Sequence, residues 1–394
     1  MIAIRNSRWL SIAAYAGMFG FGIVMAILGA ILPVIAGRMH INLAHAGDLF
    51  LAMNAAMLAA TLITGPLLDR FGHKWPLISG ACLVAFALVL IAQAAAFAGV
   101  RAAVIVLGFG GGVLNQTTNT LISDIYPEWG QKTAALNLLG VFFGIGALFI
   151  PFTIGSLLHS FGLVNILYLT AGLVLIPAVL GLVLAFPEPQ HRSGTPLHQA
   201  VRLLKKPLIW ALAFLLFFES GNEFIIGGYL TTYFTTYSGI GVSVASYLLA
   251  VYWGAIMIGR IVMGRMRIHP VRLVQASAIG VAGSMLLVLF APPGWAMAIG
   301  VVLLGLSIAT IFPTVLAEAG SWFPAYTGTV FSILIGVALT GGITLPWATG
   351  GLSQRTGIHT GLTFVIMDGI AVCVLQTLGN AIYEGLKVRR AEIA

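Results

Sequence analysis

"GPLLDRFGHKWP" (residues 65–76) lies over "GRIVMGRMRIHP" (259–270) at an offset of 194, with Gly over Gly and Pro over Pro. A second pair, "PFTIGSLLHSFG" (151–162) and "PWATGGLSQRTG" (346–357), matches at an offset of 195, again in Pro and Gly. Both offsets are close to half the length of the chain. We therefore interpret the sequence as two parallel repeats, each about half of the protein.

The composition places these repeats in a membrane. The chain has 394 residues, of which 59% are hydrophobic and only 8% are charged, whereas a soluble domain is about 25% charged. Apolar runs of about 20 residues recur from end to end, and each is long enough to cross a bilayer as a helix. The sequence predicts an all-α membrane protein and excludes a large soluble domain.

The apolar runs divide into twelve expected transmembrane helices, six in each repeat. We predict an N-terminal six-helix bundle over 1–186, a polar linker over 187–206 and a C-terminal six-helix bundle over 207–394. Two such halves suit transport by alternating access, with the substrate near the membrane midplane. The expected helices are 9–36, 44–68, 75–97, 102–124, 132–158, 164–186, 207–236, 243–264, 272–290, 294–318, 327–352 and 360–386.

The net charge of +8 could indicate binding to nucleic acid, but the positions of the basic residues argue against it. Of the 19 Lys and Arg, fifteen fall on one side of the predicted topology, three (Arg38, Arg101 and Arg355) on the other, and Arg260 inside a helix. The positive-inside rule then makes both termini cytoplasmic. We expect a multi-pass protein of the bacterial inner membrane, in contact with the lipid bilayer and monomeric, with no nucleic-acid partner.

Cysteines and histidines give no sign of a metal site, a cofactor or an enzyme. The two cysteines lie inside predicted helices and the eight histidines lie at helix ends or in loops. The first apolar run is too long for a signal-peptide core, so we expect it to remain as the first helix. We predict no cofactor and no bound metal, and no enzymatic activity.

The loop "GPLLDRFGHK" (65–74) resembles the signature between helices 2 and 3 of the major facilitator superfamily. The matching residues are Gly65, Asp69, Arg70, Gly72 and Lys74, while His73 replaces the usual first basic residue. The resemblance implies the major facilitator fold of twelve helices. It also implies a gating role for Asp69 and Arg70, which can form charge-assisted bonds that close the cytoplasmic side.

In that superfamily the loop arginine typically pairs with an acid at the cytoplasmic end of helix 4, a position that Asp124 fits. The offset of 194 places Asp124 on Glu318. The resemblance and the repeat together imply that Glu318 pairs with Arg260 or Arg265. The alternative is that these charges only anchor the topology.

A narrower resemblance, to the fucose permease family of sugar:proton symporters, covers both halves. Two facts depart from that family: the first helix, 9–36, has no Asp or Glu, and Asn115 takes the place of a helix 4 glutamate. The resemblance implies a sugar as substrate and proton coupling through another acid. It is carried by "GGGVLNQTTNTLI" (110–122), "LNLLGVFFGIGALFIP" (136–151), "ESGNEFIIGGYLTTY" (219–233) and "IFPTVLAEA" (311–319).

Two acids lie in the middle of the seventh helix. Glu219 is about 18 Å from the start of the helix at 1.5 Å per residue, near the bilayer centre, and Glu223 follows one turn later on the same face. An ionised side chain there costs about 3 kcal/mol or more, so intramembrane acids are functional by default. We expect Glu223, with Glu219, to carry the coupling proton. The alternative is that each only bonds a neighbouring helix.

Amides and aromatic residues at mid-membrane are the candidate substrate ligands, since amides suit sugar hydroxyls and tryptophan stacks on a pyranose ring. They could equally join helices or fill space. The candidates, besides Glu219, are Asn115, Gln116 and Asn119 of helix 4, Asn54 of helix 2, Asn222 of helix 7, Trp253 of helix 8 and Trp347 of helix 11. Asp368 of helix 12 is expected to be structural.

The sequence therefore favours a secondary active transporter, a monosaccharide:proton symporter that works by alternating access. The alternative is a proton-antiport exporter of drugs or metabolites. Sodium coupling is a further possibility, because carboxylates and amides also bind hard cations, and a passive uniporter is another, because the acid of helix 1 is missing. No nucleophile motif supports an intramembrane enzyme, and no soluble output domain supports a sensor.

Overall fold

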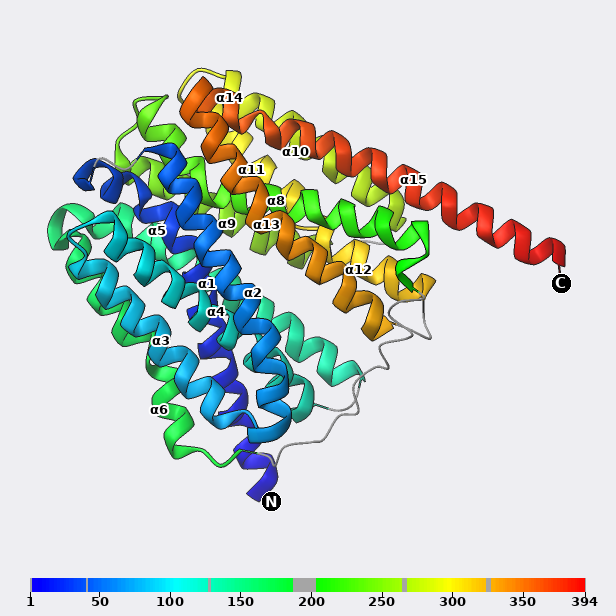
Figure 1. Ribbon diagram of the computed structural model, residues 1–394, viewed down its shortest axis with the longest axis horizontal. Helices are drawn as coiled ribbons and strands as arrows, with labels where there is room; N and C mark the ends of the chain where they lie inside the picture. The colour runs from blue at the N-terminus through cyan, green and yellow to red at the C-terminus, as the bar shows by residue number, and fades with distance from the viewer. Residues whose placement is uncertain are drawn as a thin grey trace. The chain divides into compact units, whose positions relative to one another are not determined.

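The computed structural model describes residues 2–39, 42–126, 129–186, 203–263, 268–323 and 327–393, and these are α-helical with short connections (Figure 1). No strand occurs within these ranges. Most of the predicted linker, 187–202, lies outside the described residues. The helices are α1 (Ile2–Met39), α2 (Leu43–Phe71), α3 (Lys74–Gln93), α4 (Phe97–Ile125), α5 (Trp129–Val174), α6 (Ile176–Val183), α8 (Pro207–Thr236), α9 (Val242–Met263), α10 (Pro270–Phe290), α11 (Trp295–Ile308), α12 (Ile311–Trp322), α13 (Thr327–Thr356), α14 (Ile358–Leu362) and α15 (Phe364–Ile393).

The number of membrane spans agrees with the predicted fold. Among the described residues, 11 helical stretches are long and apolar enough to cross a membrane. One of them, Leu138–Val183, is 46 residues long and contains a non-helical residue, Gly162. Such a stretch is about twice the length that one crossing needs, so it provides two spans. The structure confirms the all-helical membrane fold and is consistent with twelve helices.

The repeat found in the sequence reappears in the backbone. Pro151 lies inside α5 and Pro346 lies inside α13, at equivalent positions. Eleven residues after each proline, a glycine with positive φ interrupts or ends the helix: Gly162 with φ 72° and Gly357 with φ 91°. Only glycine adopts such a conformation without steric cost. The two glycines of the repeat therefore have the same structural task, which is to break the helix at an equivalent point.

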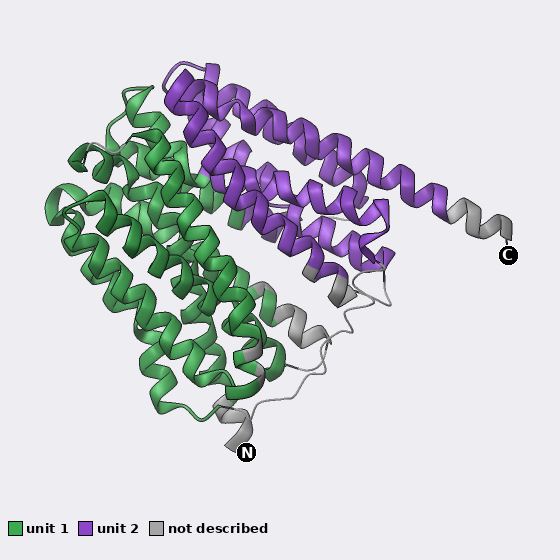
Figure 2. Ribbon diagram, in the orientation of Figure 1, with its two compact units in different colours: residues 1–192, 227–257 green, residues 193–226, 258–394 purple. Residues whose placement is uncertain are grey.

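The chain forms two compact units (Figure 2). Unit 1 consists of Met1–Arg192 and Gly227–Met257, and unit 2 consists of Ser193–Ile226 and Ile258–Ala394. The chain passes between the units inside α8 and α9, so this grouping by contacts differs from the predicted division at 187–206. The predicted halves describe the sequence repeat, and their boundaries stay a prediction.

In unit 1, α1 and α5 pack closely against each other where each helix has a glycine. A Cβ on Gly22 would overlap the carbonyl oxygen of Phe143, and a Cβ on Gly146 would overlap the carbonyl oxygen of Phe19. Small residues allow helix backbones to approach closely in a membrane, where van der Waals packing supplies much of the association energy. The two glycines thus fix the distance between α1 and α5.

Replacing Gly146 with Leu is expected to lower the free energy of unfolding by about 1–3 kcal/mol, because the two helices must move apart. The loss should appear as a lower midpoint of thermal unfolding for the purified protein. Gly172→Leu is the matched control, since a Cβ at Gly172 meets nothing within 4 Å. Equal midpoints for the two variants would show that the crossing of α1 and α5 is not glycine-dependent.

In unit 2, α8 packs one face closely against α13. A Cβ on Gly341 would overlap the carbonyl oxygen of Phe217, and a Cβ on Gly221 would overlap the side chain of Leu345. A Cβ on Gly342 would lie 2.7 Å from the ring of Phe224. This contact fixes the rotation of α8 about its axis. The acids of α8 therefore point to the other sides of the helix.

Candidate functional site

The polar centre of α8 in unit 2 is almost completely buried. Glu219 is 1% exposed and Asn222 is 2% exposed, while the side chain of Glu223 is 14% exposed. Glu219 and Glu223 lie four residues apart in one uninterrupted helix, so they share a face. Within the described residues, Glu219 Oε2 has no hydrogen-bond partner. A buried carboxylate in this state must hold a proton or attract a cation.

Arg260 of α9 supplies the positive charge at this centre. Its Nη2 lies 3.7 Å from Glu223 Oε1, and its side chain is 33% exposed. The resemblance and the repeat implied instead that Glu318 pairs with Arg260 or Arg265. The structure shows Gln376 Nε2 of α15 donating to Glu318 Oε2 at 2.7 Å. Glu318 on α12 thus bonds α15, whereas Arg260 reaches the acid of α8. Arg265, the other proposed partner, lies outside the described residues.

The distance between Arg260 and Glu223 is longer than a charge-assisted hydrogen bond, which is about 2.7–2.9 Å. The attraction is therefore mainly electrostatic and is not locked by bidentate geometry. Such a pair separates at lower cost than a bidentate one.

Asn222 and Asp368 lie where α8 meets α15. Asn222 Nδ2 donates to the carbonyl oxygen of Val365 at 3.4 Å. Asp368, three residues further along α15, is 4% exposed. Asp368 Oδ2 and Asn222 Oδ1 have no hydrogen-bond partner within the described part of the chain. From the sequence, Asp368 is expected to be structural, but among the described residues this oxygen makes no hydrogen bond that would serve such a role.

In unit 1, the candidate amides of α4 form a pair. Asn119 Nδ2 donates both to Asn115 Oδ1 and to the Asn115 carbonyl oxygen, each at 2.9 Å. Both residues, and the neighbouring Gln116, are half-buried. The bond leaves Asn115 Nδ2 and Asn119 Oδ1 unused, so the pair presents one donor group and one acceptor. A pair of that kind can bind adjacent hydroxyl groups of a sugar.

The other predicted ligands differ in environment. Asn54 of α2 is 2% exposed and donates to the Phe50 carbonyl oxygen of its own helix at 3.0 Å. Trp253 of α9 is 1% exposed and lies edge-on to Phe143, with ring centroids 6.2 Å apart. Trp347 of α13, in contrast, is 48% exposed. Trp253 therefore serves the packing of unit 1 first, although its indole nitrogen has no partner among the described residues.

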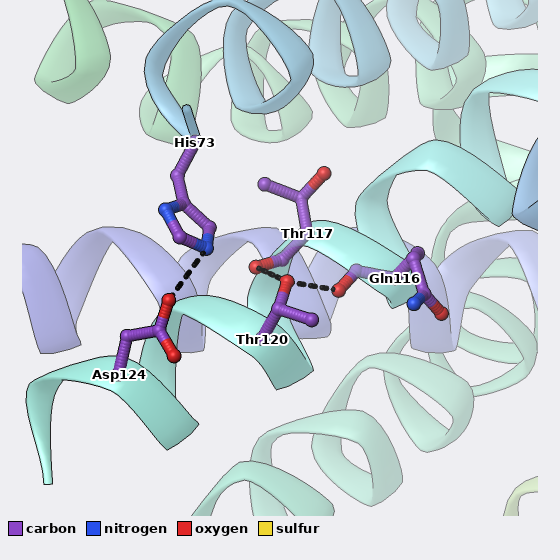
Figure 3. Close-up of polar contacts among 5 residues, drawn as sticks. All are labelled: His73, Gln116, Thr117, Thr120 and Asp124. Atoms are coloured by element: carbon purple, nitrogen blue, oxygen red, sulfur yellow. Dashed lines mark hydrogen bonds and ion pairs between the residues drawn. The ribbon is translucent and has the colours of Figure 1, made fainter. Parts of the chain in front are cut away.

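The signature loop forms a contact with the end of α4. His73, at the N-cap of α3, is buried, and its Nε2 lies 3.5 Å from Asp124 Oδ2. Figure 3 shows this pair beside the last turns of α4, where Thr120 donates to the Gln116 carbonyl oxygen at 2.7 Å. The resemblance to the superfamily implied Arg70 as the partner of Asp124. Arg70 is exposed, with its guanidinium 5.2 Å from the ring centroid of Phe71.

The side chain of Asp69 lies outside the described residues. His73 replaces a basic residue of the signature, and that replacement was the sequence signal for its contact with Asp124. Gln376, the partner of Glu318, gave no such signal, because a lone glutamine in an apolar helix has many possible partners. Within the described residues, no group of three or more His, Cys, Asp or Glu side chains is arranged to hold a metal ion.

Comparison with known proteins gives a family. A model of the Major Facilitator Superfamily matches residues 14–266. The human vesicular acetylcholine transporter is 30% identical over 175 residues, which are 42% of this chain and 32% of that protein, so the chain matches about a third of that relative's length. The mouse sodium-dependent glucose transporter 1A is 25% identical over 353 residues, covering 79% of this chain and 81% of that protein.

Solved structures agree with the fold. The nucleoside transporter NupG superposes with a TM-score of 0.79 at 15% identity, covering 96% of this chain and 99% of its own. A D-xylose-proton symporter gives 0.78 at 16% identity over 95% and 97% of the two chains. The E. coli fucose:proton symporter gives 0.64 at 18% identity over 95% and 99%. The resemblance inferred from the sequence motifs is confirmed at the level of the fold.

Proposed function

The chain belongs to the Major Facilitator Superfamily and is a multi-pass membrane transporter, not an enzyme, and we propose that it carries a monosaccharide or similar polyol in symport with protons. Relatives and structural neighbours include proteins named as glucose, xylose and fucose transporters. The observation that carries the proposal is the contact between Glu223, in the middle of α8, and Arg260, in the last turn of α9. A small-molecule substrate and a coupling ion are the partners that this function requires.

The coupling mechanism follows from the chemistry of that contact. When Glu223 is ionised, it attracts Arg260 and holds α8 against α9. When Glu223 takes up a proton, the attraction is lost, and Arg260 is free to interact with Glu219 on the same face of α8. Two states of unit 2 then differ in their affinity for a proton, and a ligand that prefers one of them shifts the balance. Glu219 serves as the second acid of this exchange.

The amide pair of α4 is our proposed contact with the sugar. Asn119→Ala is expected to raise the KM for the sugar about 2- to 10-fold, because one hydrogen bond of about 0.5–1.5 kcal/mol is lost. The number of protons moved per sugar should stay the same. Asn165→Ala is the matched control, since Asn165 is an exposed amide that donates to its own helix. An unchanged KM for Asn119→Ala would remove Asn119 from the binding site.

The proposed location is a bacterial inner membrane with both termini in the cytoplasm. The support is the distribution of Lys and Arg between the two sides of the predicted topology. A single cysteine placed after residue 390 in a variant without Cys82 and Cys373 should react with a membrane-impermeant maleimide only after the cells are opened. Labelling in intact cells would reverse the proposed orientation.

The function itself can be tested with purified protein in liposomes that contain a pH-sensitive dye. Monosaccharides are added outside one at a time, without an imposed gradient. Acidification of the lumen by one sugar would show sugar:proton symport and would identify the substrate. If no sugar acidifies the lumen, symport of the tested sugars is excluded, and proton-antiport export of drugs or metabolites becomes the leading function.

A further inference from the structure

Two contacts define how α8 and α15 pack in unit 2. A Cβ on Gly379 of α15 would lie 3.8 Å from the side chain of Leu212 and 3.9 Å from that of Leu208. Near the other end, Asn222 Nδ2 of α8 donates to the carbonyl oxygen of Val365 at 3.4 Å. The helices therefore run antiparallel, and the residues between these two points on the facing stripes share one layer.

Helical spacing places two acids in that layer. Glu219 follows Leu212 by seven residues and precedes Asn222 by three, so it lies on the stripe of α8 that faces α15. Asp368 follows Val365 by three residues, on the stripe of α15 that faces α8. Asn222 and Val365 are in contact. Because the helices are antiparallel, moving three residues back from Asn222 along α8 and three residues forward from Val365 along α15 leads in the same direction and over the same distance. Glu219 and Asp368 thus occupy the same level.

Three oxygen atoms of this layer have unused lone pairs. Glu219, Asn222 and Asp368 are 1%, 2% and 4% exposed. Glu219 Oε2, Asn222 Oδ1 and Asp368 Oδ2 have no hydrogen-bond partner within the described residues. Leaving a buried acceptor unsatisfied costs about 1–3 kcal/mol, and more when the group is charged. Unsatisfied oxygens in one buried layer favour the binding of a ligand that accepts their lone pairs.

The charges point to the same conclusion. The middle of these helices carries three carboxylates, Glu219, Glu223 and Asp368, and the positive group that the structure places beside them is Arg260, in contact with Glu223. The sequence of α8 contains no Lys or Arg, and that of α15 contains none before Lys387. With all three carboxylates ionised, the fixed charges sum to a negative value, which a mobile cation can partly offset.

We propose that the layer between α8 and α15 binds a sodium ion through Asp368 and the amide oxygen of Asn222, with Glu219 as a negative charge on the same level. Carboxylate and amide oxygens are the ligands that hard cations prefer. One carboxylate and one amide oxygen supply a single negative charge, which matches a monovalent ion. This site goes beyond the proposed proton coupling at Glu223, and it does not depend on which substrate is carried.

The test uses the full-length protein in detergent, without sugar and without a proton gradient. Sodium chloride replaces choline chloride at constant total concentration, and both the midpoint of thermal unfolding and the binding of radioactive sodium are followed. We expect saturable stabilisation and saturable binding for the wild type. Asp368→Asn should weaken the apparent sodium affinity by about tenfold or more, since ligand charge sets the affinity of such sites.

Two further variants keep the outcome decisive. Asn222→Ala removes an amide oxygen without changing the charge, so it tests the site even if Asp368→Asn fails to fold, and it should also weaken sodium binding. Glu384→Gln is the matched control: it neutralises an exposed acid of the same helix, and sodium affinity should stay at the wild-type value.

The proposal is overturned by either of two results. Identical unfolding midpoints of the wild type in sodium and choline, with no sodium binding, would mean that Asp368 is held as a neutral acid. Undiminished sodium binding by both Asp368→Asn and Asn222→Ala would place the ion elsewhere. Neither result bears on sugar:proton symport, which is measured by acidification of liposomes.

Discussion

Uphill accumulation of sugar should disappear when Glu223 is replaced by Gln, while exchange of sugar across the membrane continues. Glutamine has nearly the shape of a protonated glutamate but cannot release a proton, so the step that couples the gradient to transport is lost. For one proton per sugar, a gradient of one pH unit drives about tenfold accumulation. In the variant, the internal concentration should only reach the external one.

The measurement compares two assays on the same proteoliposomes. Uptake of labelled sugar under an imposed pH gradient reports coupling, and counterflow against unlabelled sugar reports exchange. Glu384→Gln, an exposed acid on α15, should behave as the wild type in both. Normal uphill uptake by Glu223→Gln would remove Glu223 from the coupling role, and loss of both activities would indicate a substrate ligand instead of a coupling acid.

Replacing Arg260 with Met is expected to abolish transport and to lower stability by about 2 kcal/mol. Removing one partner of a buried ion pair costs about 3–5 kcal/mol, and we reduce that figure because a third of the Arg260 side chain is exposed. The remaining carboxylates, Glu219 and Glu223, would then share one face of α8 without a positive charge. Thermal unfolding of the purified variant gives the stability.

A second substitution separates charge from packing. In Arg260→Met with Glu223→Gln, both partners of the pair are neutral, so most of the lost stability should return. Transport in the double variant should be limited to exchange, as in Glu223→Gln alone. If the double variant is as unstable as Arg260→Met, the arginine stabilises unit 2 through its packing and not through Glu223.

The sequence was sufficient to predict the fold. Apolar runs, the loop at 65–74 and the repeated Pro and Gly positions led to the superfamily, because each of these signals is local or periodic. Glu219 and Glu223 could be placed at mid-membrane from chain length alone. These predictions needed only the rise of a helix and the thickness of a bilayer.

The pairing of charges could not be predicted in the same way. Glu318 was expected to meet Arg260 or Arg265 because the repeat placed Glu318 on Asp124, but the repeat does not fix which way each helix is rotated. In the structure, Glu318 bonds Gln376 and Arg260 lies against Glu223. Rotation is decided by close contacts such as that of Gly341 with Phe217, which no spacing rule reveals.

Asp124 illustrates a second limit of the sequence. The signature implied Arg70 as its partner, yet the structure shows His73 at 3.5 Å. A histidine at the start of α3 is held by the turn and reaches Asp124 directly, whereas the longer arginine extends over Phe71. Which of the two residues contacts Asp124 therefore depends on the length of the side chain and on the geometry of the turn. The gating role of the loop stays a prediction, and the residue that contacts Asp124 was not foreseen.

The order of charges along the chain has a consequence for biosynthesis. Glu219 and Glu223 leave the ribosome before Arg260, which follows 37 residues after Glu223. At about 3 kcal/mol for each acid near the bilayer centre, α8 is costly to release into lipid while its counter-charge is still in the ribosome. We expect the translocon to retain α8 until α9 arrives, so that the two helices enter the lipid together with Arg260 offsetting one of the two acids.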